Sequence, residues 1–193
     1  MQVNFNATCS SHMPILIEFI NNFKPQKVLE FGSGYFSTKI FSERCTNYTA
    51  VEITSKIWYN MVSKKYKTAK WNYTFARDHD EALNSLFGYF DLIFIDCSEP
   101  RIKVVNPCFY HTKNIVIHDT QLWWTKQIVI PEEFEVFIFK QFPIKYSYKR
   151  RDAFAHRPWT TLFTSDKKVI EYFNKVNEKN LYSAYRFPYG ASK

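Results

Sequence analysis

A chain of 193 residues with 46% hydrophobic side chains is long enough to bury a core without disulfides or metals. Its formal net charge of +8 permits a polyanionic partner such as RNA or DNA but does not require one. Its beginning lacks the pattern of a secretory leader, no apolar run reaches the length of a membrane span, and the four cysteines form no C-x-x-C pair. We therefore expect one cytoplasmic domain over residues 1–193, without a membrane partner.

Apolar runs of strand length alternate with amphipathic runs of helix length, which is typical of an α/β domain with a mainly parallel sheet. A helical lead-in over about 1–26 comes first. We expect strands at 27–31, 48–52, 71–76, 90–95 and 114–118, with helices between them at 37–44, 55–66, 80–87 and 101–110.

The last third of the chain departs from strict alternation. Pro131 followed by acidic residues predicts a helix at about 131–141. Strands at 144–149 and 159–163, a helix from Asp166 to about Asn177 and an irregular tail at 181–193 complete the prediction. The fold expected is a Rossmann-like, doubly wound sheet of seven strands, mainly parallel with an antiparallel last strand.

Two of the four glycines lie together in Gly32-Ser33-Gly34, directly after the first expected strand. Small residues there allow the backbone to approach a ligand closely. Because the carboxyl ends of parallel strands meet at one edge, polar residues that follow the strands should gather beside this turn. These residues are Glu30, Glu52, Asp78, His79 and Asp96.

The segment Glu30-Phe31-Gly32-Ser33-Gly34-Tyr35-Phe36-Ser37-Thr38 resembles the first motif of class I S-adenosylmethionine-dependent methyltransferases, with Phe36 added before Ser37-Thr38. Val51-Glu52-Ile53 followed by Trp58-Tyr59 resembles their second motif. Residues 90–96 and 115–123 are similar to the fourth- and fifth-strand motifs of small O-methyltransferases of the catechol type and their bacterial relatives. The resemblance covers roughly residues 12–123.

This resemblance implies an enzyme that uses S-adenosylmethionine and methylates an oxygen of an acceptor that the sequence does not identify, either a small molecule or a polyanion such as RNA or DNA. Gly32 and Gly34 would then contact the methionine portion, and Glu52 the ribose. The adenine edge would be bound by Asp78 or His79. Glu30, Ser33 and Asp96 would complete the cofactor site.

An oxygen acceptor must lose a proton, which requires a general base or a metal ion. Asp119 and His118 end the fifth expected strand and are the candidate catalytic residues. Asp96 and Asp119 end adjacent strands and could share a divalent cation through carboxylate oxygens. Enzymes of the catechol type hold a metal in this region, but Thr120 stands where they have an amide ligand, so metal dependence stays open.

Two other classes of function stay open. A nicotinamide-dependent oxidoreductase would also use a glycine turn and an acid after the second strand, but its fingerprint has a third small residue where this chain has Ser37. A nucleic-acid or protein-surface binding module that retains the fold with little or no turnover would account for the net charge. It would also account for the alternation of basic and aromatic residues over 145–151.

Overall fold

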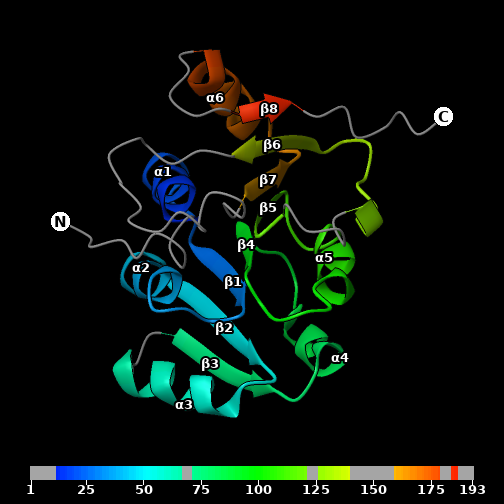
Figure 1. The fold of residues 1–193 in the computed structure, drawn as a ribbon. Helices are drawn as coiled ribbons and strands as arrows, with labels where there is room; N and C mark the ends of the chain where they lie inside the picture. The colour runs from blue at the N-terminus through cyan, green and yellow to red at the C-terminus, as the bar shows by residue number, and fades with distance from the viewer. Residues whose placement is uncertain (1–11, 67–70, 121–125, 140–158, 179–183, 187–193) are drawn as a thin grey trace, which may run out of the picture.

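The computed structural model describes residues 12–66, 71–120, 126–139, 159–178 and 184–186. These residues form one eight-stranded sheet with the order β3-β2-β1-β4-β5-β7-β6-β8 (Figure 1). The strands are β1 Lys27–Phe31, β2 Asn47–Ile53, β3 Trp71–Ala76, β4 Leu92–Ile95, β5 Asn114–His118, β6 Glu135–Phe139, β7 Thr160–Thr164 and β8 Ala184–Arg186.

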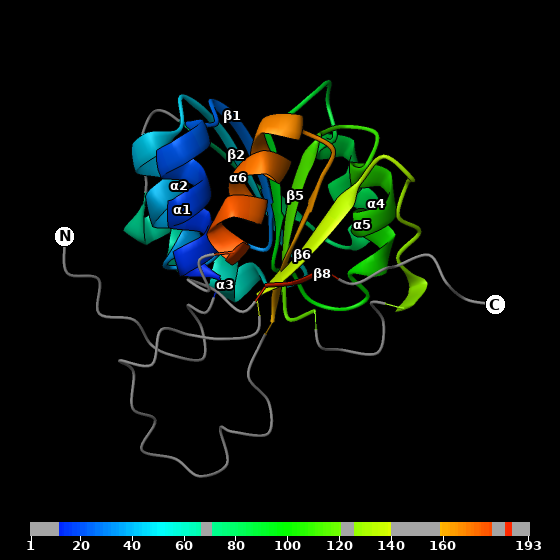
Figure 2. The same cartoon turned by 90° about the horizontal axis from the view of Figure 1, so that it is seen from above.

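Helices cover both faces of this sheet (Figure 2). One face packs against α1 (Met13–Phe23), α2 (Ser37–Arg44) and α6 (Lys167–Glu178). The opposite face packs against α4 (His79–Ala82) and α5 (Ile102–Cys108), and a short 3₁₀ turn, Leu83–Ser85, follows α4. The remaining helix, α3 (Lys56–Lys65), lies beside β2 and β3. No helix in the described part of the chain combines the length and hydropathy that a membrane crossing needs.

The five strands from β1 to β5 are parallel, and β7 runs antiparallel to both β5 and β6. Every residue of β4 is buried, as expected for a central strand covered on both faces. The chain winds outward from β1 to β2 and β3 on one side, and continues through β4 and β5 on the other. The doubly wound, mainly parallel fold predicted from the sequence is thus confirmed, with its switch point between β1 and β4.

The helix predicted at about 131–141 is wrong. Pro131 begins a turn, in which the amide of Phe134 donates to the Pro131 carbonyl oxygen, and β6 follows. Alternate residues of β6 face opposite sides of the sheet. Val136 and Ile138 belong to the hydrophobic core on the α5 side, and Phe137 and Phe139 belong to the core on the α1 and α6 side. Burial on both faces of a β-branched and aromatic run therefore outweighs the helix-start signal of the acidic residues.

The carboxyl-terminal part differs from the prediction in a second place. β8 pairs with β6 in antiparallel orientation, so the tail predicted as irregular contains a short strand, which extends the predicted seven-stranded sheet by one strand. The strand predicted at 144–149 lies outside the described residues. The predicted helix at 80–87 is shorter, since α4 ends at Ala82 and passes into the 3₁₀ turn.

The turn after β1 is fitted tightly between its neighbours. Gly32 has a φ of +84°, and a Cβ atom added to it would lie 2.3 Å from the carbonyl oxygen of Asp96. Its amide donates to the Val51 carbonyl oxygen at 2.8 Å, while the Asp96 amide donates to that of Phe31 at 2.8 Å. The carboxyl ends of β1, β2 and β4 are therefore held together at a contact that only glycine permits.

A fully buried carboxyl group, Glu30, lies beneath this turn. Its Oε2 accepts hydrogen bonds from the Tyr48 hydroxyl and from Thr38 Oγ1, the latter at 2.9 Å. Thr38 Oγ1 also accepts from the amide of Gly34 at 3.0 Å. Glu30 thus connects β2, the first turn of α2 and the glycine turn, and burial raises its pKa to about 8.

We predict that Gly32→Ala destabilises the protein by about 2–4 kcal/mol, because it adds an overpacked contact to an unfavourable left-handed backbone. Gly88→Ala is the matched control. Gly88 has a φ of +71°, but among the described residues a Cβ there would meet only Lys27 Nζ within 4 Å, at 3.5 Å. This substitution should cost about 1 kcal/mol. Urea unfolding measures both variants, and equal losses would contradict the packing at Gly32.

We also predict that the free energy of unfolding falls as the pH rises from 4.5 towards 8. In this window folded Glu30 keeps a proton that the unfolded chain releases, because its pKa is about 8 instead of 4.5. Glu30→Gln should make this slope shallower by about 1 kcal/mol per pH unit. Glu171→Gln, a substitution at an exposed residue, should keep the wild-type dependence of the unfolding free energy on pH in the same urea titrations. An unchanged slope in Glu30→Gln would refute a buried, protonated Glu30.

Candidate functional site

The glycine turn and the acid that ends β2 are joined directly. Glu52 Oε2 accepts from the amide of Ser33 at 3.1 Å and from Ser33 Oγ at 2.8 Å. Ser33 Oγ also lies 2.5 Å from the Tyr73 hydroxyl on β3. On the other side of the turn, Trp58 Nε1 donates to the Ser33 carbonyl oxygen at 2.6 Å. The structure thus brings together two elements of the expected cofactor site that are 19 residues apart.

Local sequence explains why Trp58 reaches the turn. Ser55 caps α3 by accepting from the Trp58 amide at 3.2 Å, so the helix starts immediately after β2 and places Trp58 in its first turn. Tyr35 packs against the Trp58 ring with centroids 4.8 Å apart. Aromatic contacts therefore close the outer side of the turn.

Glu52 is only 6% exposed. Burial raises its pKa to about 7, although the hydrogen bonds from Ser33 act in the opposite direction. A carboxylate at this place can accept hydrogen bonds from ligand hydroxyl groups, as the resemblance implies for the ribose.

The residues expected at the adenine edge lie at the end of β3. Asp78 is exposed and caps α4 by accepting from the Glu81 amide at 2.8 Å. His79 is buried, and its Nε2 lies 2.8 Å from the Ser98 carbonyl oxygen. Ser98 Oγ lies 3.2 Å from Thr54 Oγ1, so the ends of β2, β3 and β4 meet here. A role of Asp78 or His79 towards adenine stays a prediction.

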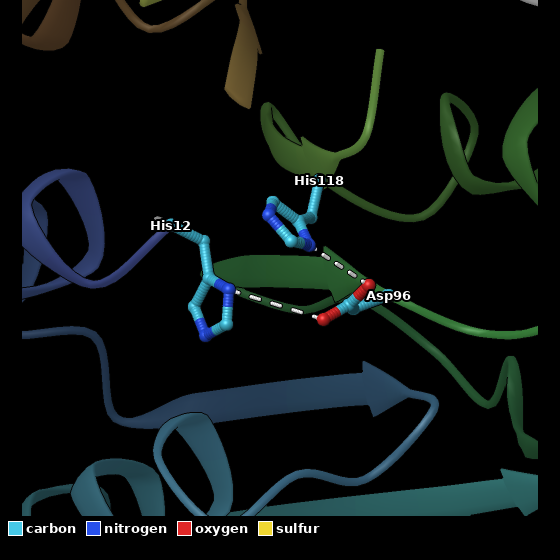
Figure 3. A group of neighbouring side chains, drawn as sticks. All are labelled: His12, Asp96 and His118. Carbon is cyan, nitrogen blue, oxygen red and sulfur yellow. Dashed lines mark hydrogen bonds and ion pairs between the residues drawn. The ribbon is translucent and has the colours of Figure 1, made fainter. Parts of the chain in front are cut away.

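A second polar group lies at the ends of β4 and β5, around Asp96 (Figure 3). His118 Nδ1 is 3.1 Å from Asp96 Oδ1, and His12 Nδ1 is 3.8 Å from Asp96 Oδ2. His12 precedes α1, so the lead-in helix brings an imidazole to the edge formed by the central strands. The two imidazole rings lie edge to face with centroids 4.8 Å apart.

Arg101 lies between the two aspartates that were expected to share a cation. It is 8% exposed, and its NH2 group is 3.6 Å from Asp96 Oδ1 and 3.3 Å from Asp119 Oδ2. Its NH1 group donates to the His118 carbonyl oxygen at 2.6 Å. Among the described residues a guanidinium therefore bridges this carboxylate pair, while His118 Nε2 lies 3.7 Å from Asp119 Oδ1.

Neighbouring charges in this group stabilise the ionised forms of Asp96 and His118. Burial alone would raise the pKa of Asp96, but the neighbouring His118, His12 and Arg101 lower it below its usual value. For His118 burial opposes the charged form, yet the Asp96 carboxylate raises its pKa above the usual value. His12 behaves differently, because burial and the charge of His118 lower its pKa to about 3. Asp96 and His118 thus form an ion pair beside a neutral His12.

Sequence reasoning located the turn, Glu52, Asp96, His118 and Asp119 at this edge, and missed two residues. Arg101 was read only as the start of a helix, although Glu99-Pro100 directly before it marks a change of chain direction after β4. His12 precedes every recognised motif, so no local signal connects it with strand ends more than 80 residues away. Only the packing of α1 on the sheet reveals it.

Comparisons with known proteins give evidence at the level of structure. No family model matches the chain, and no curated protein matches it. A solved methyltransferase from Podospora anserina, bound to SAH, superposes with a TM-score of 0.56 at 15% identity, over 79% of this chain and 77% of that one. An rRNA methylase from Streptococcus thermophilus superposes with a TM-score of 0.56 at 8% identity, over 84% and 98%.

Spermidine synthase from Thermotoga maritima superposes with a TM-score of 0.51 at 16% identity, over 85% of this chain and only 61% of its own length. At these identities the likeness concerns the fold, and it does not extend to the catechol-type subgroup. The strand order from β3 to β6, with β7 antiparallel, is that of the Rossmann-like methyltransferase fold. The chain thus has the Rossmann-like fold of class I S-adenosylmethionine-dependent methyltransferases.

Proposed function

We propose that this protein binds S-adenosylmethionine and transfers its methyl group to an oxygen of an acceptor. The observation that carries the proposal is the direct bonding of Glu52 to Ser33, which joins an acid and a glycine turn at the switch point of the sheet. Ligands of doubly wound sheets bind at this point, outside the carboxyl ends of the strands. One solved methyltransferase with this fold is bound to SAH, which supports an S-adenosylmethionine-type cofactor for this protein.

The residues at the turn fit such a cofactor. A Cβ atom added to Gly34 would meet only Ser37 Oγ within 4 Å, at 3.2 Å, among the described residues outside its immediate neighbours. The turn therefore offers bare backbone to the methionine portion at this position. Glu52 supplies the carboxylate for the ribose hydroxyls, and Asp78 or His79 the polar edge for adenine. Glu30 acts from beneath, by holding the turn through Thr38.

When bound, the cofactor supplies a methyl group that its sulfonium already activates. The chain has to align the acceptor and remove its proton. Asp119, at the end of β5, is the group of this edge that we propose to accept that proton. His118 is ion-paired with Asp96 and its Nε2 lies 3.7 Å from Asp119 Oδ1, so we assign it the role of positioning the Asp119 carboxylate. Arg101 fixes their positions through its bonds to the His118 carbonyl oxygen and the Asp119 carboxylate.

The acceptor is proposed to be a small molecule, with an RNA or DNA acceptor as the alternative. The side chains of His118 and Asp119 are only 5% and 29% exposed, so a small acceptor reaches them more easily than a polymer does. The rRNA methylase among the similar structures illustrates the alternative. The basic and aromatic run at 145–151, which suggested a polyanion, lies outside the described residues.

The proposal predicts that the protein binds S-adenosylmethionine in isothermal titration calorimetry and that Glu52→Gln weakens binding by about 10- to 100-fold. The titration is made above pH 7, where Glu52 is mostly ionised because its pKa is about 7. A hydrogen bond to a charged acceptor contributes about 1.5–3 kcal/mol. Glu171→Gln, an exposed carboxylate on α6, is the matched control and should bind like the wild type.

Two results of this titration would refute the proposal. One is the absence of heat from S-adenosylmethionine with folded protein. The other is a Glu52→Gln variant with wild-type affinity, which would separate the acid from the cofactor. Titration of NAD⁺ in parallel distinguishes the oxidoreductase alternative, for which binding of NAD⁺ without binding of S-adenosylmethionine is the signature.

A further inference from the structure

We propose that His12, Asp96 and His118 form a binding site for a divalent first-row transition-metal ion. The three residues come from the start of α1 and the ends of β4 and β5, and each offers one ligand atom to a common space (Figure 3). Two imidazole nitrogens and one carboxylate oxygen are ligands that zinc, cobalt and iron accept in proteins.

The distances suit a small cation. Metal–ligand bonds of about 2.0–2.2 Å place neighbouring ligand atoms of a tetrahedral ion roughly 3.3–3.6 Å apart. The two imidazoles face different oxygens of one carboxylate: His118 Nδ1 lies 3.1 Å from Asp96 Oδ1, and His12 Nδ1 lies 3.8 Å from Asp96 Oδ2. All three ligand atoms lie within 4.8 Å of one another. Because 4.8 Å exceeds the ligand separation of a tetrahedral site, the ligand atoms would move closer together when an ion binds.

His12 gives an independent indication of a ligand. The residue is 2% exposed, and neither ring nitrogen makes a hydrogen bond with the described residues. Burying a polar ring nitrogen without a partner costs free energy, so native proteins rarely leave one in that state. Since His12 Nδ1 faces the Asp96 carboxylate, a cation between them would satisfy the nitrogen.

The surrounding charges also favour a doubly charged ion. Arg101 lies 3.6 Å from Asp96 Oδ1, but it also lies 3.6 Å from Glu99 Oε1 and 3.3 Å from Asp119 Oδ2. Once His118 binds the ion as a neutral ring in place of its ion pair with Asp96, three carboxylates and one guanidinium leave a net charge of minus two in this group. A divalent cation would neutralise that charge.

This site differs from the carboxylate pair that the sequence suggested. Arg101 bridges Asp96 Oδ1 and Asp119 Oδ2, whereas His12 lies against Asp96 Oδ2. The ion that we propose would bind to His12, His118 and Asp96 and leave Asp119 outside its ligand set. Three protein ligands would leave coordination positions open to a donor atom of a small acceptor. That last connection rests on the proposed function, whereas metal binding itself does not.

The test is a Co²⁺ titration of the full chain after chelator treatment, in the absence of S-adenosylmethionine. We expect one Co²⁺ per chain, with visible absorption bands, and competition by Zn²⁺. His12→Ala should weaken Co²⁺ binding at least tenfold, and so should His118→Ala. His111→Ala is the matched control, because His111 bonds to the Gly88 carbonyl oxygen away from this group and should keep wild-type affinity.

Several outcomes would overturn the site. Folded wild-type protein that binds no stoichiometric Co²⁺ excludes it. Wild-type affinity in His12→Ala, together with strong weakening in Asp119→Asn, would instead identify the Asp96–Asp119 pair. Circular dichroism checks the fold of each variant, and His12→Gln, closer in size to histidine, replaces His12→Ala if the latter unfolds.

The two proposals fail separately. Co²⁺ binding without any affinity for S-adenosylmethionine would retain the metal site and remove the methyltransferase proposal. S-adenosylmethionine binding without Co²⁺ binding would remove the metal site alone.

Discussion

The contact between Gly32 and the backbone of Asp96 is the constraint on which the functional edge depends. A side chain at position 32 would collide with the Asp96 carbonyl group, so the end of β1 approaches β4 only because glycine is present. The same turn is bonded to β2 through the Val51 carbonyl oxygen. Three neighbouring strands therefore end at fixed positions, and the side chains that follow them point into one region.

That arrangement gathers acidic groups at a cost in free energy. Glu30 and Glu52 are buried, and burial raises their pKa values to about 8 and about 7. Asp96 remains ionised because His118 and Arg101 surround it. The edge thus holds carboxyl groups of two kinds: two that are easily protonated near the turn, and one that is held as an anion at the switch point. Such separation of pKa values is common at functional sites.

The central half of the fold was predictable because its signals are local. Five strands of strongly apolar residues alternate with amphipathic segments, and the residues that end them identify the edge at which Glu52 and Asp96 lie. The sequence did not predict β6, because Pro131 and the acidic residues after it form a typical helix start. The strand conformation is instead favoured by burial of the β6 side chains against α5 on one face and α6 on the other. β8 is only three residues long, so its pairing with β6 decides its conformation.

The polar network around Asp96 could be predicted only in part, for the same physical reason. Asp96, His118 and Asp119 follow strands and were found by their positions. Arg101 and His12 contact Asp96 because α5 and α1 pack on the sheet, and no residue spacing in the sequence predicts that packing. Glu30 was expected at the cofactor, yet in the structure it bonds to Tyr48 and Thr38 beneath the turn, so any effect on the cofactor would pass through Thr38 and Gly34.

The most direct test of the central claim, that the edge between β1 and β4 binds the cofactor, is a titration of ¹⁵N-labelled protein with S-adenosylhomocysteine, followed by amide chemical shifts. The account predicts that the largest changes fall on Gly32, Ser33, Gly34 and Glu52, with Asp96 and Cys97 also affected. Changes concentrated at the opposite end of the strands, in the pocket lined by Lys24, Asp91 and Asn114, would contradict it, as would a spectrum that does not change.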